Sequence, residues 1–121
     1  MNPIAAALVS GTVGWAAENA LYGHDQGRVR ENAYLKGLPF LPVYAAGGGA
    51  LALMTPALRK QPWPVRGLAY AGALTAIEAG AGALDKQAGR QSWDYGGGSR
   101  VDLTHAALWG ALGLLVEPLL R

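Results

Sequence analysis

The stretch from Val65 to Leu84, VRGLAYAGALTAIEAGAGAL, is apolar, has the length of a helix and carries one internal acid, Glu78. A matching stretch, IAAALVSGTVGWAAENALY, runs from Ile4 to Tyr22 and carries Glu18, which precedes Glu78 by 60 positions. Each stretch leads into a polar loop. We interpret the two stretches as the first helices of two copies of one helix-loop-helix unit.

Four apolar blocks lie between the charged segments of the chain, in which 15% of the 121 residues are charged and 51% are hydrophobic. A helix that spans a membrane needs about 20 predominantly apolar residues, with a range of roughly 17 to 25. The pattern predicts an all-α polytopic membrane protein, one domain over residues 1–121, with two repeats of parallel topology. The predicted spans are residues 4–22, 40–58, 65–84 and 103–120.

Several classes of protein and site are excluded or not expected. The chain has no cysteine, which excludes disulfides and cysteine-based metal sites. His24 and His105 are too isolated to indicate a metal centre, and a solvated or capping role suits them better. No basic run is long enough to follow a nucleic acid backbone. We therefore expect no metal, no cofactor and no nucleic acid partner, and we expect the first block to be retained because it lacks the basic segment of a signal peptide.

The two internal glutamates are the main candidates for function. A charge near the centre of a bilayer costs about 2.5 to 3.5 kcal/mol, so a buried glutamate must be paired, protonated or exposed to a wet cavity. If Glu18 and Glu78 share one interior, each raises the pKa of the other, and the pair could exchange a proton or hold a cation. Helical spacing places two sets of residues on inward faces: Gly11, Trp15, Glu18 and Tyr22, and Ala71, Thr75, Glu78, Gly82 and Asp85.

An alternative interpretation gives these acids a structural role. Glu18 and Glu78 could reach interfacial water or pair with loop arginines, because guanidinium groups make bidentate contacts with carboxylates. Glu117 is expected at the membrane interface. The candidate arginines are Arg28, Arg30, Arg90 and Arg100.

Two of the segments between the blocks carry a tryptophan. In the joining segment from Arg59 to Pro64, two prolines are expected to stop the helix and Trp63 to lie at the lipid headgroups. In the last loop, Trp93 and Tyr95 suit a membrane interface, and Asp94 between them is expected to cap a helix or to bind an arginine. The lysine and arginine count, four on the side of the joining segment against six on the other, leaves the orientation open.

These residues resemble the putative ABC-transporter type IV family, also called CmpB-like, of small bacterial membrane proteins. The resemblance rests on Gly14-Trp15 with Glu18, on Lys36–Tyr44, on Glu78, and on Arg90 with Trp93-Asp94-Tyr95. It implies a permease in the bacterial inner membrane, although this chain has Gly96 where the family usually has serine. The residues that the resemblance marks as important are Trp15, Glu18, Pro42, Tyr44, Glu78, Arg90, Trp93, Asp94 and Tyr95.

Three classes of function follow. The first is a transporter-like or permease-like subunit whose substrate or ion site contains Glu18, Glu78, Trp15 and Tyr44, with small multidrug-resistance exporters as a mechanistic model for proton coupling. The second is a structural or accessory subunit of a membrane complex. The third is a membrane enzyme, for which Glu18, Glu78, Asp94, Tyr95 and His105 could converge. The chain has no phosphate-binding loop and cannot hydrolyse ATP alone, and its glycine-rich helix faces predict a homo-oligomer or a partner within the lipid bilayer.

Overall fold

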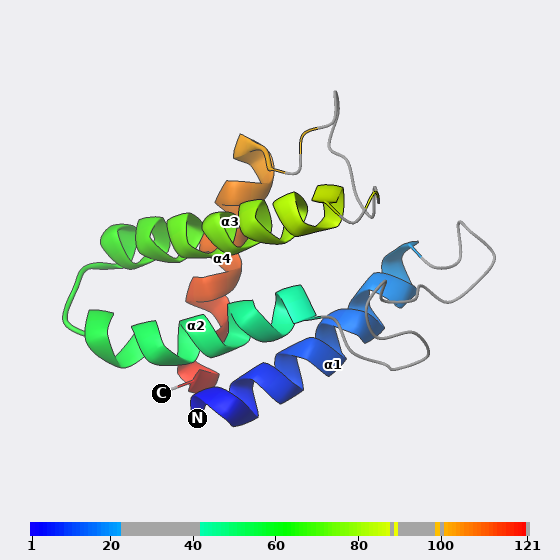
Figure 1. Ribbon diagram of the computed structural model, residues 1–121. Coiled ribbons are helices and arrows are strands. Elements are labelled where there is room, and N and C mark those ends of the chain that lie inside the picture. Colours follow the sequence, from blue (N-terminus) through cyan, green and yellow to red (C-terminus); the bar gives the residue numbers. More distant parts are fainter. Residues whose placement is uncertain (23–41, 88, 90–98, 100, 121) are drawn as a thin grey trace.

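The computed structural model contains four α-helices and, within its described residues, no strand (Figure 1). The helices are α1 (Pro3–Tyr22), α2 (Pro42–Leu58), α3 (Trp63–Gln87) and α4 (Leu103–Leu120). The structure describes residues 1–22, 42–87, 89, 99 and 101–120, without the side chains of residues 18, 19, 21 and 22. The all-α prediction and its four helices are confirmed.

Glycines allow the helices to approach closely within two pairs, α1 with α2 and α3 with α4. A Cβ atom built on Gly48 of α2 would lie 2.8 Å from the carbonyl oxygen of Ala6 and would collide with Ser10. A Cβ atom built on Gly113 of α4 would lie 2.6 Å from the Cβ of Tyr70. Close backbone approach of this kind is how helices associate where apolar burial supplies little drive.

The two pairs cross in the same register. Ser10 contacts Gly48 in the first pair, and Tyr70 contacts Gly113 in the second pair. Tyr70 lies 60 positions after Ser10, and Gly113 lies 65 positions after Gly48. The same two offsets relate another contact: a Cβ on Gly49 lies 3.7 Å from Ala7, and a Cβ on Gly67 lies 3.1 Å from Leu114. Equivalent residues therefore make equivalent contacts in the two helix pairs.

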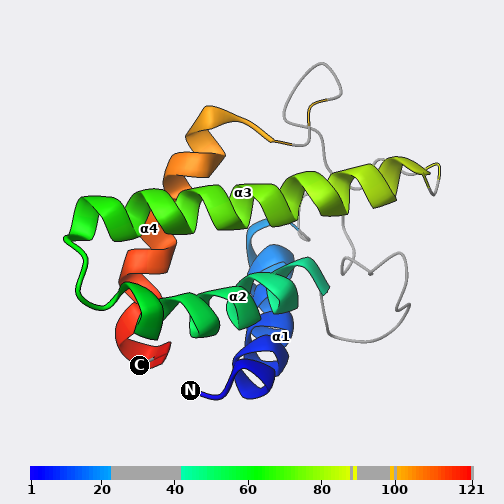
Figure 2. The same cartoon turned by 60° about the vertical axis from the view of Figure 1, so that its left-hand side comes forward.

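The pairs meet along α2. Gly47 of α2 faces Leu74 of α3, and the ring of Tyr44 packs edge to face on Trp109 of α4 with centroids 6.2 Å apart. Tyr44 and Trp109 are themselves related by the offset of 65 positions. Figures 1 and 2 show α2 and α3 side by side, while α4 runs steeply across both of them.

Polar and apolar residues are both buried in the interior. The buried residues include three acids and a threonine, Glu78, Asp85, Glu117 and Thr55. All four helices expose large apolar side chains, among them Ile4, Leu53, Leu68 and Leu115. Among the described residues, α4 is long and apolar enough to cross a membrane, and the apolar part of α1, Pro3–Ala17, is shorter.

The helix limits differ from the predicted spans at the joining segment. The third helix begins at Trp63, not Val65, and continues to Gln87. The expectation that both prolines stop the helix was wrong for Pro64, which lies in the first turn of α3, where a missing backbone N–H has no helical acceptor to lose. The last helix begins at Leu103, as predicted.

Asp102 caps the start of α4. Its Oδ1 accepts a hydrogen bond of 2.7 Å from the backbone N–H of His105 and lies 2.7 Å from the Nδ1 of the same residue. The backbone hydrogen bond is the main reason that the pKa of Asp102 lies below its ordinary value, and the imidazole contact lowers that pKa further. The carboxylate form therefore stabilises the first turn of α4.

This cap predicts a pH dependence of stability. Because the pKa is depressed in the folded state, the cap contributes fully above the unfolded value of about 3.9 and is lost as pH falls through the folded pKa. An Asp102→Ala variant is expected to melt a few degrees below the parent at pH 7, with a smaller difference at pH 2, where the side chain keeps an acceptor oxygen but has lost its charge. Thermal unfolding followed by circular dichroism at both pH values tests this, with Asp102→Asn as a control that keeps a capping oxygen without the titration. A difference of the same size at both pH values would contradict the ionic contribution.

Candidate functional site

Tyr44 lies where the helices converge. Its ring packs against Gly14 of α1, where a side chain would collide with it, and its edge meets Trp109 of α4. Three residues further along α2, Gly47 contacts Leu74 of α3. A half-buried aromatic ring from α2 therefore lies among contacts that join all four helices.

The acids of α3 lie on its buried face. Tyr70, Leu74, Glu78, Gly82 and Asp85 form a stripe at helical spacing, and all five are buried. The inward orientation that spacing predicts for Glu78 and Asp85 agrees with their burial, 6% and 3% exposed. The stripe places two carboxyl groups at different levels of the interior.

The packing register brings Tyr44 to the level of Glu78. The chain reverses direction between α2 and α3, and the two helices lie side by side in both views (Figures 1 and 2). Gly47 of α2 contacts Leu74 of α3. Tyr44 lies about one turn before Gly47, and Glu78 lies about one turn after Leu74, so in helices of opposite direction Tyr44 and Glu78 lie at the same level. Two of the predicted site residues therefore share one level of the helix assembly.

Other polar atoms face the interior. The hydroxyl oxygens of Thr55 and Thr75 and the indole nitrogen of Trp109 are buried and have no hydrogen-bond partner within the described part of the chain. Thr75 lies one turn from Glu78 on α3, and Trp109 contacts Tyr44. Buried polar groups normally find hydrogen-bond partners, so these atoms add donors and acceptors that an interior ligand or water could use.

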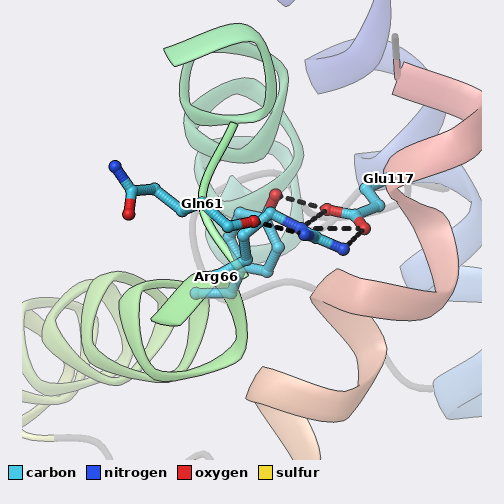
Figure 3. Close-up of polar contacts among 4 residues, drawn as sticks. Gln61, Arg66 and Glu117 are labelled. Carbon is cyan, nitrogen blue, oxygen red and sulfur yellow. Dashed lines mark hydrogen bonds and ion pairs between the residues drawn. The ribbon is translucent and has the colours of Figure 1, made fainter. Parts of the chain in front are cut away.

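A second polar cluster joins the start of α3 to the end of α4 (Figure 3). Arg66 Nη2 donates to Glu117 Oε1 at 2.9 Å, and Arg66 Nε lies 3.1 Å from Oε2. The hydroxyl of Tyr70 donates to Oε2 at 2.7 Å, and Arg66 Nη1 donates to the carbonyl oxygen of Gln61 at 2.6 Å. The side chains of Arg66 and Glu117 are 17% and 6% exposed, so the ion pair is largely removed from solvent.

The structure shows that Glu117 is buried and paired with Arg66, and the expectation that it lies at the membrane interface stays a prediction. Arg66 and Glu117 are 51 positions apart, and no local periodicity connects them. The available signal was Arg66 itself, because an arginine placed two residues into an apolar helix-length stretch requires an acceptor for its charge. Sequence reasoning assigned such partners to loop arginines and missed this one.

The remaining predicted site residues divide into two groups. Trp15 is half-buried on α1, next to the glycine that receives Tyr44, whereas the side chain of Glu18 lies outside the described residues. The interior pair of Glu18 and Glu78 stays a prediction. The predicted residues of the polar loops also lie outside the described residues: His24, Arg28, Arg30, Arg90, Trp93, Asp94, Tyr95 and Arg100.

The described residues can hold a proton or a polar group but include no metal centre. Within those residues, no group of three or more histidine, aspartate or glutamate side chains could bind a metal ion together. At one level of the assembly, α3 instead supplies the carboxyl group of Glu78, and α2 and α4 supply the aromatic rings of Tyr44 and Trp109. This combination suits an exchangeable proton or a cation, because ring faces and carboxylates both attract positive charge.

Comparison with known proteins gives one match. The family model described as putative ABC-transporter type IV (CmpB) matches residues 7–121. No curated protein and no solved structure matches the chain.

Proposed function

Because the chain belongs to the putative ABC-transporter type IV family, we propose that it is a permease-like subunit embedded in the bacterial inner membrane. Its helices form two equivalent halves in the bilayer, and its interior carboxyl groups serve a proton or cation that moves through or regulates the subunit. The chain lacks a phosphate-binding loop, so transport driven by ATP requires a separate ATPase subunit.

The observation that carries this proposal is the distribution of polarity. Glu78, Asp85 and Glu117 are buried inside the helix assembly, while each helix exposes at least one large apolar side chain. In water this arrangement would leave large apolar areas exposed, which soluble monomers rarely do. In a bilayer, ionisable residues are expected to face the protein interior, where they mark the paths of ions and substrates.

The repeated register supports the two halves. Equivalent contacts hold α1 to α2 and α3 to α4, and Tyr44 meets its own equivalent, Trp109, between the halves. In transporters built from repeats, substrate and ion sites lie near the midplane between the repeats. The level shared by Tyr44 and Glu78 is therefore our candidate for the site, with Glu18 as the proposed second carboxyl group.

The proposed chemistry assigns a role to each described residue. Glu78 carries the exchangeable proton, Thr75 supplies a hydroxyl one turn away, and Tyr44 and Trp109 form the aromatic wall. The Arg66–Glu117 pair lies near the joining turn, outside this level, and Glu117 is already engaged in an ion pair with Arg66. Glu117 is therefore not a candidate for the exchangeable group.

The role of Glu78 gives a direct prediction. In proteoliposomes with an entrapped pH-sensitive dye, the parent protein is expected to dissipate an imposed pH gradient faster than empty vesicles do. Glu78→Gln is expected to reduce that rate to the level of empty vesicles, because an amide cannot exchange the proton, and Glu18→Gln is expected to do the same.

The matched control is Lys86→Gln, which removes an exposed charge from the same helix. Circular dichroism and size-exclusion chromatography check that each variant stays folded. Unchanged proton flux together with unchanged stability in both glutamate variants would show that the interior acids have no role in transport.

An accessory or structural role is the second candidate, and the Arg66–Glu117 pair favours it. A buried ion pair that ties two helices together is a structural feature and needs no substrate. One purification separates the two roles. The tagged chain is isolated from native membranes in mild detergent, its partners are identified by mass spectrometry, and its copy number is measured by native mass.

The purification has three possible outcomes with different meanings. A stoichiometric ATPase in the purified material is the result expected for a permease-like subunit. Recovery as a bare homo-oligomer would favour an autonomous proton-coupled transporter. Recovery with a large assembly that contains no ATPase would favour the accessory role and overturn the permease proposal.

A further inference from the structure

The joining turn between α2 and α3 presents a basic tip. Arg59 and Lys60 are adjacent and exposed, and Trp63, 67% exposed, follows them at the start of α3. The turn has a defined backbone, in which Gln61 N–H donates to the carbonyl oxygen of Leu58 at 2.9 Å. We call Arg59, Lys60 and Trp63 the basic tip.

The Arg66–Glu117 ion pair holds this tip in place. Arg66 uses one part of its guanidinium group for Glu117 and donates Nη1 to the carbonyl oxygen of Gln61, the residue that follows Lys60 (Figure 3). Glu117 is the acid at this end of the described chain, and its charge is matched by Arg66. Glu117 therefore does not neutralise the positive charges of Arg59 and Lys60.

Comparison of the two halves indicates that the ion pair does more than hold two crossing helices together. By the same offsets of 60 and 65 positions, Arg66 and Glu117 correspond to Ala6 and Ala52 in the first pair. Both alanines are buried, and α1 crosses α2 in the equivalent register without any ion pair there. Burying charges carries a desolvation cost. What the ion pair adds, and the alanines cannot, is the hydrogen bond that fixes the turn at Gln61.

From these observations we infer that the basic tip is a docking surface for the phosphate headgroups of anionic phospholipids. The inference rests on the proposed location in a membrane. Guanidinium and ammonium groups bind phosphate, and Trp63 has the amphipathic ring that suits the headgroup level. Exposed Leu53 and Leu68 continue from the tip along α2 and α3, so acyl chains can cover them below a bound headgroup.

The test uses the full chain in nanodiscs that contain equal amounts of phosphatidylglycerol and phosphatidylcholine. After transfer to mild detergent, native mass spectrometry measures the ratio of the two lipids that remain bound. The parent protein is expected to retain phosphatidylglycerol in preference to phosphatidylcholine. The Arg59→Gln/Lys60→Gln variant is expected to lose about fivefold in this preference for each charge removed.

Controls make the outcomes distinct. Lys86→Gln removes a charge near the opposite end of α3 and is expected to leave the ratio unchanged. The same ratio in the parent and in the double variant would overturn the inference. Loss of the preference when inorganic phosphate replaces chloride at equal ionic strength would also overturn it, because the tip would then be a site for free phosphate and not for a lipid headgroup.

The fixed turn has its own test. An Arg66→Ala/Glu117→Ala variant gives the second crossing the alanines of the first and releases Gln61. It is expected to remain folded and to lower the lipid preference, and an unchanged preference would overturn the positioning role of Arg66. Failure of the chain to enter nanodiscs would instead contradict the proposed membrane location, so the two failures can be told apart.

Discussion

Replacing Gly48 with alanine is expected to reduce the free energy of unfolding by about 1–3 kcal/mol, the range typical of overpacked interiors. The added methyl group would lie 2.8 Å from the carbonyl oxygen of Ala6 and would also meet Ser10. The Ser10 hydroxyl can rotate away, but the Cβ of Ser10, at 2.5 Å, and the backbone oxygen of Ala6 belong to α1 and can only move with it. The variant must therefore separate α1 from α2 over the whole crossing, and dispersion contacts elsewhere along it are lost as well.

The matched control is Gly72→Ala on α3. A Cβ atom at Gly72 has nothing within 4 Å, so the methyl group meets no other helix. Because alanine is the better helix former by about 1 kcal/mol, this variant is expected to be as stable as the parent or slightly more stable. Unfolding in detergent, followed by circular dichroism as denaturant is added, measures both. Equal stability of Gly48→Ala and Gly72→Ala would contradict the close crossing of α1 and α2.

Glu117→Ala is expected to cause the second large effect, a fall in melting temperature of roughly 5 °C or more. Removing the carboxylate leaves a guanidinium group largely shielded from solvent and takes the hydrogen-bond acceptor from Tyr70, which is fully buried. An uncompensated buried charge is more costly than the loss of a complete ion pair. The size of the effect therefore comes mainly from the arginine left behind.

A double-mutant cycle tests this explanation. Arg66→Ala/Glu117→Ala is expected to melt closer to the parent than Glu117→Ala does, because it removes both charges and reproduces the alanine crossing of the first half. Melting temperatures of the parent, the two single variants and the double variant complete the cycle. A double variant that melts no higher than Glu117→Ala would contradict this explanation, because removing the arginine left behind would then restore no stability.

Much of the fold could be predicted because it depends on local pattern. The limits of α4 follow from an apolar run bounded by Asp102, and the burial of Glu78 follows from its spacing with Gly82 and Asp85. The start of α3 was misplaced because prolines were taken as helix stops, although Pro64 is compatible with a first turn. The burial of Glu117 against Arg66 could not be predicted, because nothing local in the sequence shows which helix packs against it.

By itself, the sequence determined the number of helices, their apolar outer faces and the inward position of the α3 acids. The helix number follows from the count of apolar blocks, and the position of a residue on a helix face follows from spacings of three or four residues. Both are properties of single helices, so they can be read from the sequence. Only the tertiary structure decided which residues meet across helices. α4 crosses α2 and α3 steeply (Figure 1). The Tyr44–Trp109 contact joins residues 65 positions apart, and the Arg66–Glu117 pair joins residues 51 positions apart. Helix packing selects such partners by the fit of glycines against side chains and by the need to compensate a buried charge, and neither leaves a periodic trace in the sequence.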